Sequence, residues 1–304
     1  MKRALIWDYI FLLRPSLLLP VWIFLFLGYF WGSGESIFGI TLSLPLKFWR
    51  VLISYSLLCS GVYVFNQIFD IESDRRNKKL FLLPQGIISI PTAWICFSIL
   101  VGISFITGIS LGRGYLILWT ITFGMGILYS LPPFTFKGRP FLDLTFNSLG
   151  YGFITFLIGF GTISKDGLLH SLPYIFATGA IFLHTTIPDI EGDREVGEIT
   201  TGVFLGVFKT SIFALLLLLL AIFFSILFKD PFAGIISLVS IPGFILAIKR
   251  GSEEMSKKAY RIGVYGLGVL IALRFPPLLI LSFLIFIALR IYYRYRFNLT
   301  YPTI

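Results

Sequence analysis

Long apolar stretches, separated by short polar segments, run through almost the whole chain. Crossing the hydrocarbon core of a bilayer takes about 20 helical residues, and nine stretches have this length or nearly so. They lie at about residues 12–31, 46–69, 87–111, 114–131, 140–163, 170–188, 203–228, 231–248 and 260–292. The last contains Pro276-Pro277, and because proline breaks helical hydrogen bonding it is either one kinked helix or two shorter ones. We predict an all-α fold, a polytopic transmembrane bundle of about nine helices, with ten left open.

The composition supports this class of protein. Apolar residues make up 57% and charged residues 13% of the 304 residues, whereas a soluble globular protein carries about 25% charged residues. The chain is therefore predicted to be an integral, multi-pass membrane protein in contact with membrane lipids, with no nucleic-acid partner. Its formal net charge of +10 would attract anionic membrane surfaces and anionic substrates. The alternative is that the basic residues only orient the helices in the membrane.

Basic residues set the predicted orientation in the membrane. Most of the 25 Lys and Arg residues fall at the N-terminus or in loops that follow even-numbered stretches. Because such residues are enriched in cytoplasmic loops, the N-terminus is predicted to be cytoplasmic. The basic residues near the C-terminus fit ten spans slightly better than nine.

Two acidic clusters follow the second and the sixth apolar stretch. The first is residues 66–74 (NQIFDIESD) and the second is residues 189–197 (DIEGDREVG), and together they hold nearly half of the fifteen carboxylates. Both are predicted to lie on the cytoplasmic side. The separation by four stretches indicates an internal duplication, as membrane folds often show. We predict a single domain over residues 1–304, with four-helix pseudo-repeats at about 1–135 and 136–250 and a last helix.

The spacing within each cluster points to a bound cation. Asn66, Asp70 and Asp74 are four residues apart, as are Asp189 and Asp193, and on a helix this spacing places side chains on one face. Carboxylates so close repel one another unless a cation lies between them, and Mg²⁺ typically binds carboxylates, waters and substrate phosphates. Two facing stripes would hold Mg²⁺ ions around a diphosphate and favour cleavage of its C–O bond.

Basic residues adjoin both clusters and offer phosphate contacts. They are Arg75, Arg76, Lys78 and Lys79 after the first cluster and Arg194 within the second. Arginine binds phosphate oxygens as a fork and lysine as a point charge. The alternative is that these residues only enforce the cytoplasmic location of the loops.

These residues resemble a known family. The pattern Asn66-x-x-x-Asp70-x-x-x-Asp74 resembles the first Asp-rich motif of the UbiA superfamily of intramembrane prenyltransferases, and residues 189–197 resemble the second. Tyr129 to Lys137, and Arg14-Pro15 near the start, resemble further family segments, so that the resemblance covers nearly the whole chain.

The resemblance implies a helical bundle around a central cavity. There an isoprenoid group would pass from an allylic diphosphate, such as geranyl or geranylgeranyl diphosphate, to an aromatic or other lipophilic acceptor, with Mg²⁺ as the cofactor. The catalytic residues it implies are Asp70, Asp74, Asp189, Asp193 and Tyr129, whose ring would shield the allylic cation. The metal ligands it implies are those four acids and Asn66. The diphosphate-binding residues are Asn66, Arg14, Arg75, Lys78, Lys79, Lys137 and Arg194.

The chain departs from the family pattern at three positions. Gln67 stands where an Asp is common, Phe81 where an Arg is common, and Ile199 where a Lys is common. Two cations expected near the diphosphate are therefore missing, and Lys79 is a candidate replacement for the first.

Other polar residues leave alternatives open. Asp143 and Asn147 either line the acceptor side of the cavity or form hydrogen bonds between helices. His184 either deprotonates the acceptor or is a hydrogen-bonded helix histidine. Asp8 and Asp230 lie at predicted helix ends and are expected to be solvated.

Two other functions compete with prenyl transfer. A secondary cation transporter also buries acids, but its acids are expected near the bilayer midplane on broken helices. A CDP-alcohol phosphotransferase shares Asp-x-x-x-Asp, yet the Asp-Gly and Ala-Arg pairs of its longer signature do not occur beside these acids. Acceptors of the carotenoid, chlorin, quinone-precursor and glycerophosphate types all stay open.

Overall fold

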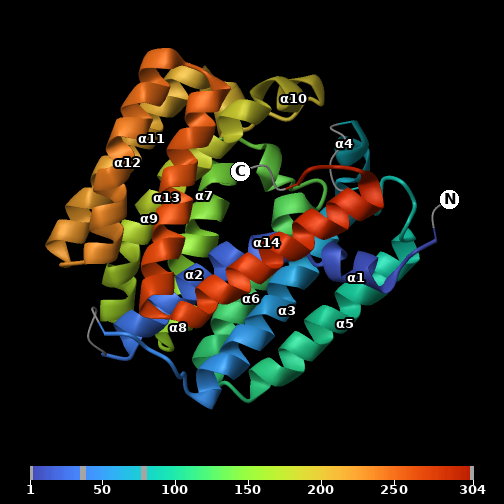
Figure 1. Ribbon diagram of the computed structural model, residues 1–304, viewed down its shortest axis with the longest axis horizontal. Coiled ribbons are helices and arrows are strands. Elements are labelled where there is room, and N and C mark those ends of the chain that lie inside the picture. The colour runs from blue at the N-terminus through green and yellow to red at the C-terminus, as the bar shows by residue number, and fades with distance from the viewer. Residues whose placement is uncertain (1–2, 35–38, 77–80, 302–304) are drawn as a thin grey trace. The chain divides into compact units, whose positions relative to one another are not determined.

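The computed structural model describes residues 3–34, 39–76 and 81–301 (Figure 1). All regular elements within these ranges are helical, which confirms the predicted all-α fold. They are α1 (Ile6–Leu12), α2 (Pro15–Gly32), α3 (Leu46–Phe69), α4 (Ile71–Arg76), α5 (Ile90–Ile109), α6 (Arg113–Ser130), η1 (Phe136–Gly138), α7 (Leu142–Asn147), the π-helix η2 (Ser148–Thr155), α8 (Phe156–Phe160), α9 (Lys165–Thr186), η3 (Ile187–Asp189), α10 (Ile190–Glu195), α11 (Thr201–Leu227), α12 (Pro231–Arg250), α13 (Glu253–Arg274) and α14 (Pro276–Phe297).

Seven helical segments in the described ranges are long and apolar enough to cross a membrane. They are α2, α3, α5, the segment Lys165–Glu195 that contains α9, α11, α12 and α14. The predicted stretch 114–131 is helix α6, and the stretch 140–163 is divided among α7, η2 and α8, so neither is among the seven. The stretch 260–292 is two helices, because α13 ends at Arg274 and Pro276 begins α14.

The chain forms two compact units. Unit 1 contains Met1–Trp22, Phe38–Gly112 and Ile271–Ile304, and unit 2 contains Ile23–Ile37 and Arg113–Leu270. Unit 1 therefore combines segments from both ends of the chain. The predicted duplication at about 1–135 and 136–250 stays a prediction.

In unit 1, α3 and α5 run side by side (Figure 1). Two serines join them at close range: the Ser54 hydroxyl donates to the Ser104 carbonyl at 2.8 Å, and the Ser104 hydroxyl donates to the Ser54 carbonyl at 2.6 Å. Small hydroxyl residues let apolar helices approach closely and hydrogen-bond across the interface. This reciprocal pair fixes how far one helix can slide along the other.

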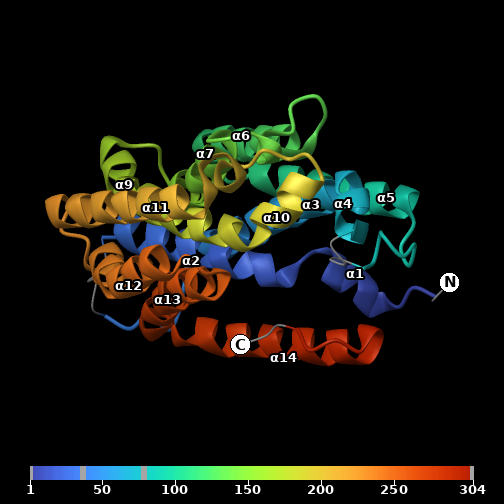
Figure 2. The same cartoon turned by 90° about the horizontal axis from the view of Figure 1, so that it is seen from above.

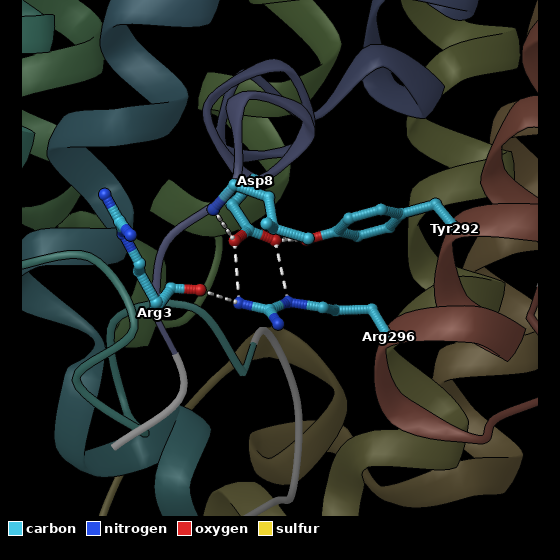
Figure 3. A network of polar contacts seen from close by, with 5 residues as sticks. Arg3, Asp8, Tyr292 and Arg296 are labelled. Carbon is cyan, nitrogen blue, oxygen red and sulfur yellow. Dashed lines mark hydrogen bonds and ion pairs between the residues drawn. The ribbon is translucent and has the colours of Figure 1, made fainter.

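A buried carboxylate links the two ends of the chain within unit 1 (Figure 3). Asp8 in α1 is 0% exposed and accepts bonds from the Arg296 guanidinium at 2.8 and 3.1 Å and from the Tyr292 hydroxyl at 2.7 Å. The ring of Tyr292 also stacks on Phe11, with 3.7 Å between centroids. The expectation that Asp8 is solvated is therefore wrong, because α14 covers it and supplies its counter-ion.

In unit 2, α11 lies between α9 and α12 (Figure 2). Small and apolar side chains from these helices form its core, among them Ala180, Leu183, Ala214, Leu218 and Phe244. Alanines at the contact let the helix axes come close, which is how transmembrane helices without a hydrophobic driving force gain packing energy. The core thus sets the position of the C-terminal end of α9, from which the second acidic cluster continues.

At Gly28, helix α2 lies directly against the backbone of α8 in unit 2. A Cβ atom at Gly28 would lie 1.9 Å from the Phe156 carbonyl oxygen and 2.7 Å from the Phe160 nitrogen. Backbone atoms cannot rotate out of the way as a side chain can, so Gly28→Val is expected to lower stability by about 1–3 kcal/mol. The thermal unfolding temperature of the purified protein in detergent tests this. Gly124→Ala is the control, because open space surrounds that position.

Asp230 in unit 2 is also buried rather than solvated. It is 2% exposed, and its Oδ1 accepts the Ala233 amide at 3.0 Å to cap α12. Burial raises the pKa of this carboxyl from 3.8 to about 6, and the neighbouring Tyr174 and Trp31 only partly oppose that rise. The earlier expectation overlooked that a residue between two helices can be enclosed by the bundle.

This carboxyl makes stability depend on pH. Because the folded protein holds the Asp230 proton more tightly than the unfolded chain, its contribution to stability is full below about pH 4 and is lost as pH rises through about 6. The unfolding temperature in detergent should therefore rise between pH 7.5 and pH 5. Asp230→Asn keeps an oxygen to cap α12 and should flatten this rise; an unchanged slope would contradict the assignment.

Candidate active site

The first acidic cluster lies in unit 1, where α3 ends and α4 begins. The Asp70 amide donates to the Asn66 carbonyl at 2.9 Å, and the Asp74 amide donates to the Asp70 carbonyl at 2.7 Å. Helical i, i+4 bonding thus continues through the junction, although Asp70 itself caps α3. Asn66, Asp70 and Asp74 consequently keep the four-residue spacing on one side of the chain that the sequence predicts.

The oxygen atoms of this cluster suit a hard cation. The Asn66 Oδ1 atom is buried and has no hydrogen-bond partner among the described residues, and Asp74 is 9% exposed. A buried amide oxygen without a donor is costly, and a metal ion or its bound water would satisfy it. Amide and carboxylate oxygens are ligands that Mg²⁺ accepts. In the described residues no group of three or more His, Cys, Asp or Glu side chains is gathered for a metal.

Gln67 is occupied elsewhere. Its amide donates to the Leu12 carbonyl at 2.8 Å and to the Tyr63 carbonyl at 3.0 Å, and the residue is 3% exposed. The departure from the family pattern at this position therefore ties α3 to the end of α1. It leaves the four-residue stripe of Asn66, Asp70 and Asp74 intact.

Basic residues near the first cluster have different surroundings. Arg75 pairs with Glu72 at 2.6 Å, on an exposed surface where such a pair stabilises little. Arg14 lies between α1 and α2, two residues after Leu12, whose carbonyl accepts from Gln67. The predicted phosphate ligands Lys78 and Lys79 lie outside the described residues.

The second acidic cluster lies in unit 2, on η3 and α10. Pro188 stands inside the short η3 turn, and Asp189 and Asp193 follow one helical turn apart. Asp193 Oδ2 accepts the Thr200 hydroxyl at 3.1 Å, and its carbonyl accepts the Glu198 amide at 2.9 Å. The chain reverses at Gly197, whose φ of 79° favours glycine. Arg194 is exposed on α10.

The segment after α6 lies beside this cluster. Lys137 pairs with Glu198 at 3.2 Å, and the Ile199 amide donates to the Gly138 carbonyl at 3.2 Å. The structure therefore brings Lys137 to the second cluster. Ile199, where a Lys is common in the family, exposes its side chain and contributes its backbone to this contact.

Asp143 and Thr201 join α7 to α11 next to the second acidic cluster, because the adjacent Thr200 binds Asp193. Asp143 is 1% exposed, and its carboxylate accepts both the Thr201 amide, at 2.8 Å, and the Thr201 hydroxyl. The Phe141 amide donates to the same hydroxyl oxygen at 2.7 Å. Of the two roles left open for Asp143, the structure shows hydrogen bonding between helices.

Sequence reasoning missed Glu198, Thr200 and Thr201 as partners of the site. Thr200 caps α11 by accepting the Val203 amide at 3.4 Å. A threonine just before a long apolar run is a recognisable N-cap signal, so the capping role of Thr200 could have been predicted from the sequence. The bond between Thr201 and Asp143 joins residues 58 positions apart and has no local signal.

His184 is buried in the core of unit 2. It is 0% exposed, and neither ring nitrogen has a hydrogen-bond partner among the described residues. Its ring meets Phe244 edge to face, with 4.4 Å between centroids. The expectation of a hydrogen-bonded histidine is therefore wrong, and the ring packs as an aromatic side chain.

Comparisons with known proteins agree with this architecture. The model of the UbiA prenyltransferase family matches residues 17–262. The chain is 30% identical over 203 residues to a 2-acyl-4-prenylphloroglucinol 6-prenyltransferase of Humulus lupulus. This alignment covers 61% of this chain and 49% of that protein. It is 30% identical over 243 residues to a digeranylgeranylglyceryl phosphate synthase of Sulfolobus acidocaldarius, which covers 75% of this chain and 84% of that protein.

A solved structure shows the same fold. A UbiA homolog from Archaeoglobus fulgidus, bound to GPP and Mg²⁺, matches with a TM-score of 0.64 at 21% identity over 88% of this chain and 99% of that chain. The chain spans about half the length of the plant relatives it matches. The seven apolar helices found in the described part of the chain, together with these matches, identify an integral, multi-pass membrane protein.

Proposed function

Because this chain belongs to the UbiA prenyltransferase family, we propose that it transfers an isoprenoid group from an allylic diphosphate to a lipophilic, aromatic acceptor within the membrane. The observation that carries this proposal is the pair of acidic clusters, each with carboxylates one helical turn apart at the end of a long apolar helix. The family match favours this activity over a cation transporter or a CDP-alcohol phosphotransferase.

Mg²⁺ would be held by Asn66, Asp70 and Asp74 in unit 1 and by Asp189 and Asp193 in unit 2. The buried, unpartnered Asn66 Oδ1 supports the first set, and the homolog from Archaeoglobus fulgidus was solved with Mg²⁺ bound. When bound, the metal would offset the negative charge that develops on the departing diphosphate.

The protein's own residues would bind the departing diphosphate and stabilise the allylic cation, the two products of ionisation. Lys137 and Arg194 of unit 2, with Arg14, Arg75, Lys78 and Lys79, would contact phosphate oxygens as the C–O bond breaks. The ring face of Tyr129 would stabilise the allylic cation. The acceptor carbon then forms the new bond and loses a proton. We further propose that the N-terminus and both acidic clusters face the cytoplasm, as the distribution of basic residues indicates.

The test uses the purified chain in detergent or nanodiscs. Geranyl and geranylgeranyl diphosphate serve as donors, with homogentisate as an aromatic acceptor and geranylgeranylglyceryl phosphate as a phosphate-bearing one. We expect pyrophosphate release that requires Mg²⁺ and stops with EDTA, together with a prenylated product of homogentisate identified by mass spectrometry. Transfer to geranylgeranylglyceryl phosphate alone would refute the aromatic acceptor. No release from either donor would refute the activity.

A further inference from the structure

The side-chain amide of Asn147 holds Tyr129 in place. Its Nδ2 atom donates to the Tyr129 hydroxyl oxygen at 3.0 Å and to the Asp143 carbonyl at 2.9 Å. A primary amide has two N–H hydrogens, so both are committed. The amide cannot rotate without losing one of these bonds, and one of the two partners is the backbone of its own helix. Asn147 is therefore a rigid donor aimed at Tyr129.

This arrangement decides what the Tyr129 hydroxyl can do. Because its oxygen accepts from Asn147, its own hydrogen must be directed away from that amide. Aromatic neighbours limit the ring: Phe146 lies 6.4 Å away with the planes 24° apart, and Phe136 packs against Phe146 at 5.0 Å. Both the direction of the hydroxyl and the tilt of the ring thus depend on α7.

The same helix is tied to the second acidic cluster. Asp143, whose carbonyl accepts from Asn147, binds Thr201 through its carboxylate. The adjacent Thr200 donates to Asp193 at 3.1 Å. All of these residues belong to unit 2. A continuous run of hydrogen bonds and backbone therefore connects a proposed metal ligand, Asp193, with the proposed cation-stabilising ring of Tyr129.

We propose that Asn147 is a positioning residue that sets Tyr129 relative to Asp193, and thereby directs the allylic cation to the acceptor rather than to water. This inference rests on the proposed function. Capture by the acceptor forms a bond to its nucleophilic atom and releases a proton. Capture by water forms a C–O bond, releases a proton and yields the prenyl alcohol. A displaced Tyr129 leaves the cation open to water, so that the share of alcohol rises.

The experiment compares Asn147→Leu and Asn147→Asp with Tyr129→Phe and the double variant Asn147→Leu/Tyr129→Phe. The donor is geranylgeranyl diphosphate, and the acceptor is whichever of homogentisate and geranylgeranylglyceryl phosphate the wild type uses. Prenylated product and geranylgeraniol are quantified by mass spectrometry, with KM for the donor and the unfolding temperature measured alongside. Thr145→Val is the matched control, because Thr145 is exposed and its hydroxyl donates to the Phe141 carbonyl at the start of the same helix.

Each single variant at Asn147 or Tyr129 should lower transfer about tenfold, the effect of one lost hydrogen bond, and raise the ratio of alcohol to product. The double variant should be no worse than either single one. KM for the donor should stay within about twofold, and Thr145→Val should match the wild type. The Asn147→Asp variant keeps the size and polarity of the side chain, so it reports on donation even where Asn147→Leu folds poorly.

Three results would overturn the inference alone. The first two are a wild-type product ratio in both Asn147 variants and losses that multiply fully in the double variant. A loss of transfer that only follows a loss of folded protein would also overturn it. A wild type that releases no pyrophosphate from the donor overturns the proposed function, and the role of Asn147 with it.

Discussion

Asp193→Ala is expected to lower prenyl transfer by about a hundredfold or more while the protein inserts and folds normally. Mutating a residue that only supports a metal ligand typically lowers metal affinity or activity about 10–100-fold, and Asp193 is proposed as a ligand itself. Its side chain is half-buried and accepts the Thr200 hydroxyl at 3.1 Å, outside the packed core of the helices, so we expect the helix packing to survive its removal. Pyrophosphate release and product formation at saturating Mg²⁺ measure the effect.

Two comparisons make this test specific. Asp70→Ala, at the corresponding place in the first cluster, should show a loss of similar size. Glu195→Ala removes an exposed carboxylate from the same short helix as Asp193 and should retain activity. Retained activity in both Asp70→Ala and Asp193→Ala would rule out the proposed metal role, whereas equal losses in all three variants would indicate a general effect of charge.

Asp8→Ala is expected to produce the largest loss of stability. It leaves the Arg296 guanidinium, whose side chain is 10% exposed, without its counter-ion and removes the acceptor of the Tyr292 hydroxyl. Breaking a buried pair by removing one partner costs about 3–5 kcal/mol. At about 2–4 °C per kcal/mol, the unfolding temperature in detergent should fall by more than about 6 °C.

The pair can be separated from its packing by a second variant. Asp8→Leu/Arg296→Met removes both charges and keeps apolar volume, so it should recover part of the stability that Asp8→Ala loses. Lys258→Ala, which breaks an exposed pair with Glu254 at 2.7 Å, should change the unfolding temperature very little. An Asp8→Ala protein as stable as the wild type would show that solvent reaches Arg296.

Periodicity and length were enough to predict most of the fold. Apolar stretches marked the long helices, and Pro276-Pro277 marked the break between α13 and α14. Residues that depend on distant partners were misjudged. Asp8 was expected in solvent because nothing near it in the sequence reveals Arg296, which lies 288 positions away. The enclosure of Asp230 likewise depends on Trp31 and Tyr174 of other helices.

The site shows the same division between local and distant information. The spacing of Asn66, Asp70 and Asp74 is a local property, and the structure keeps it. Whether Asp143 and Asn147 serve the cavity or the helix contacts could not be decided from sequence, since Thr201 and Tyr129 are remote in the chain. Gln67 stands where the family commonly has an Asp, which suggests the loss of a metal ligand. In the structure its contact with α1 gives it a structural role.

The contact between Asp8 and Arg296 has a consequence for biosynthesis. Ribosomes release the N-terminal helix long before the last helix, because 288 residues separate the two partners, and chains emerge at about 5–20 residues per second. During most of translation, the Asp8 carboxylate therefore cannot pair with Arg296, which is synthesised near the end of the chain. Nascent chains truncated before α14 should leave this part of the protein open to proteases, and the full-length product should close it in one late step.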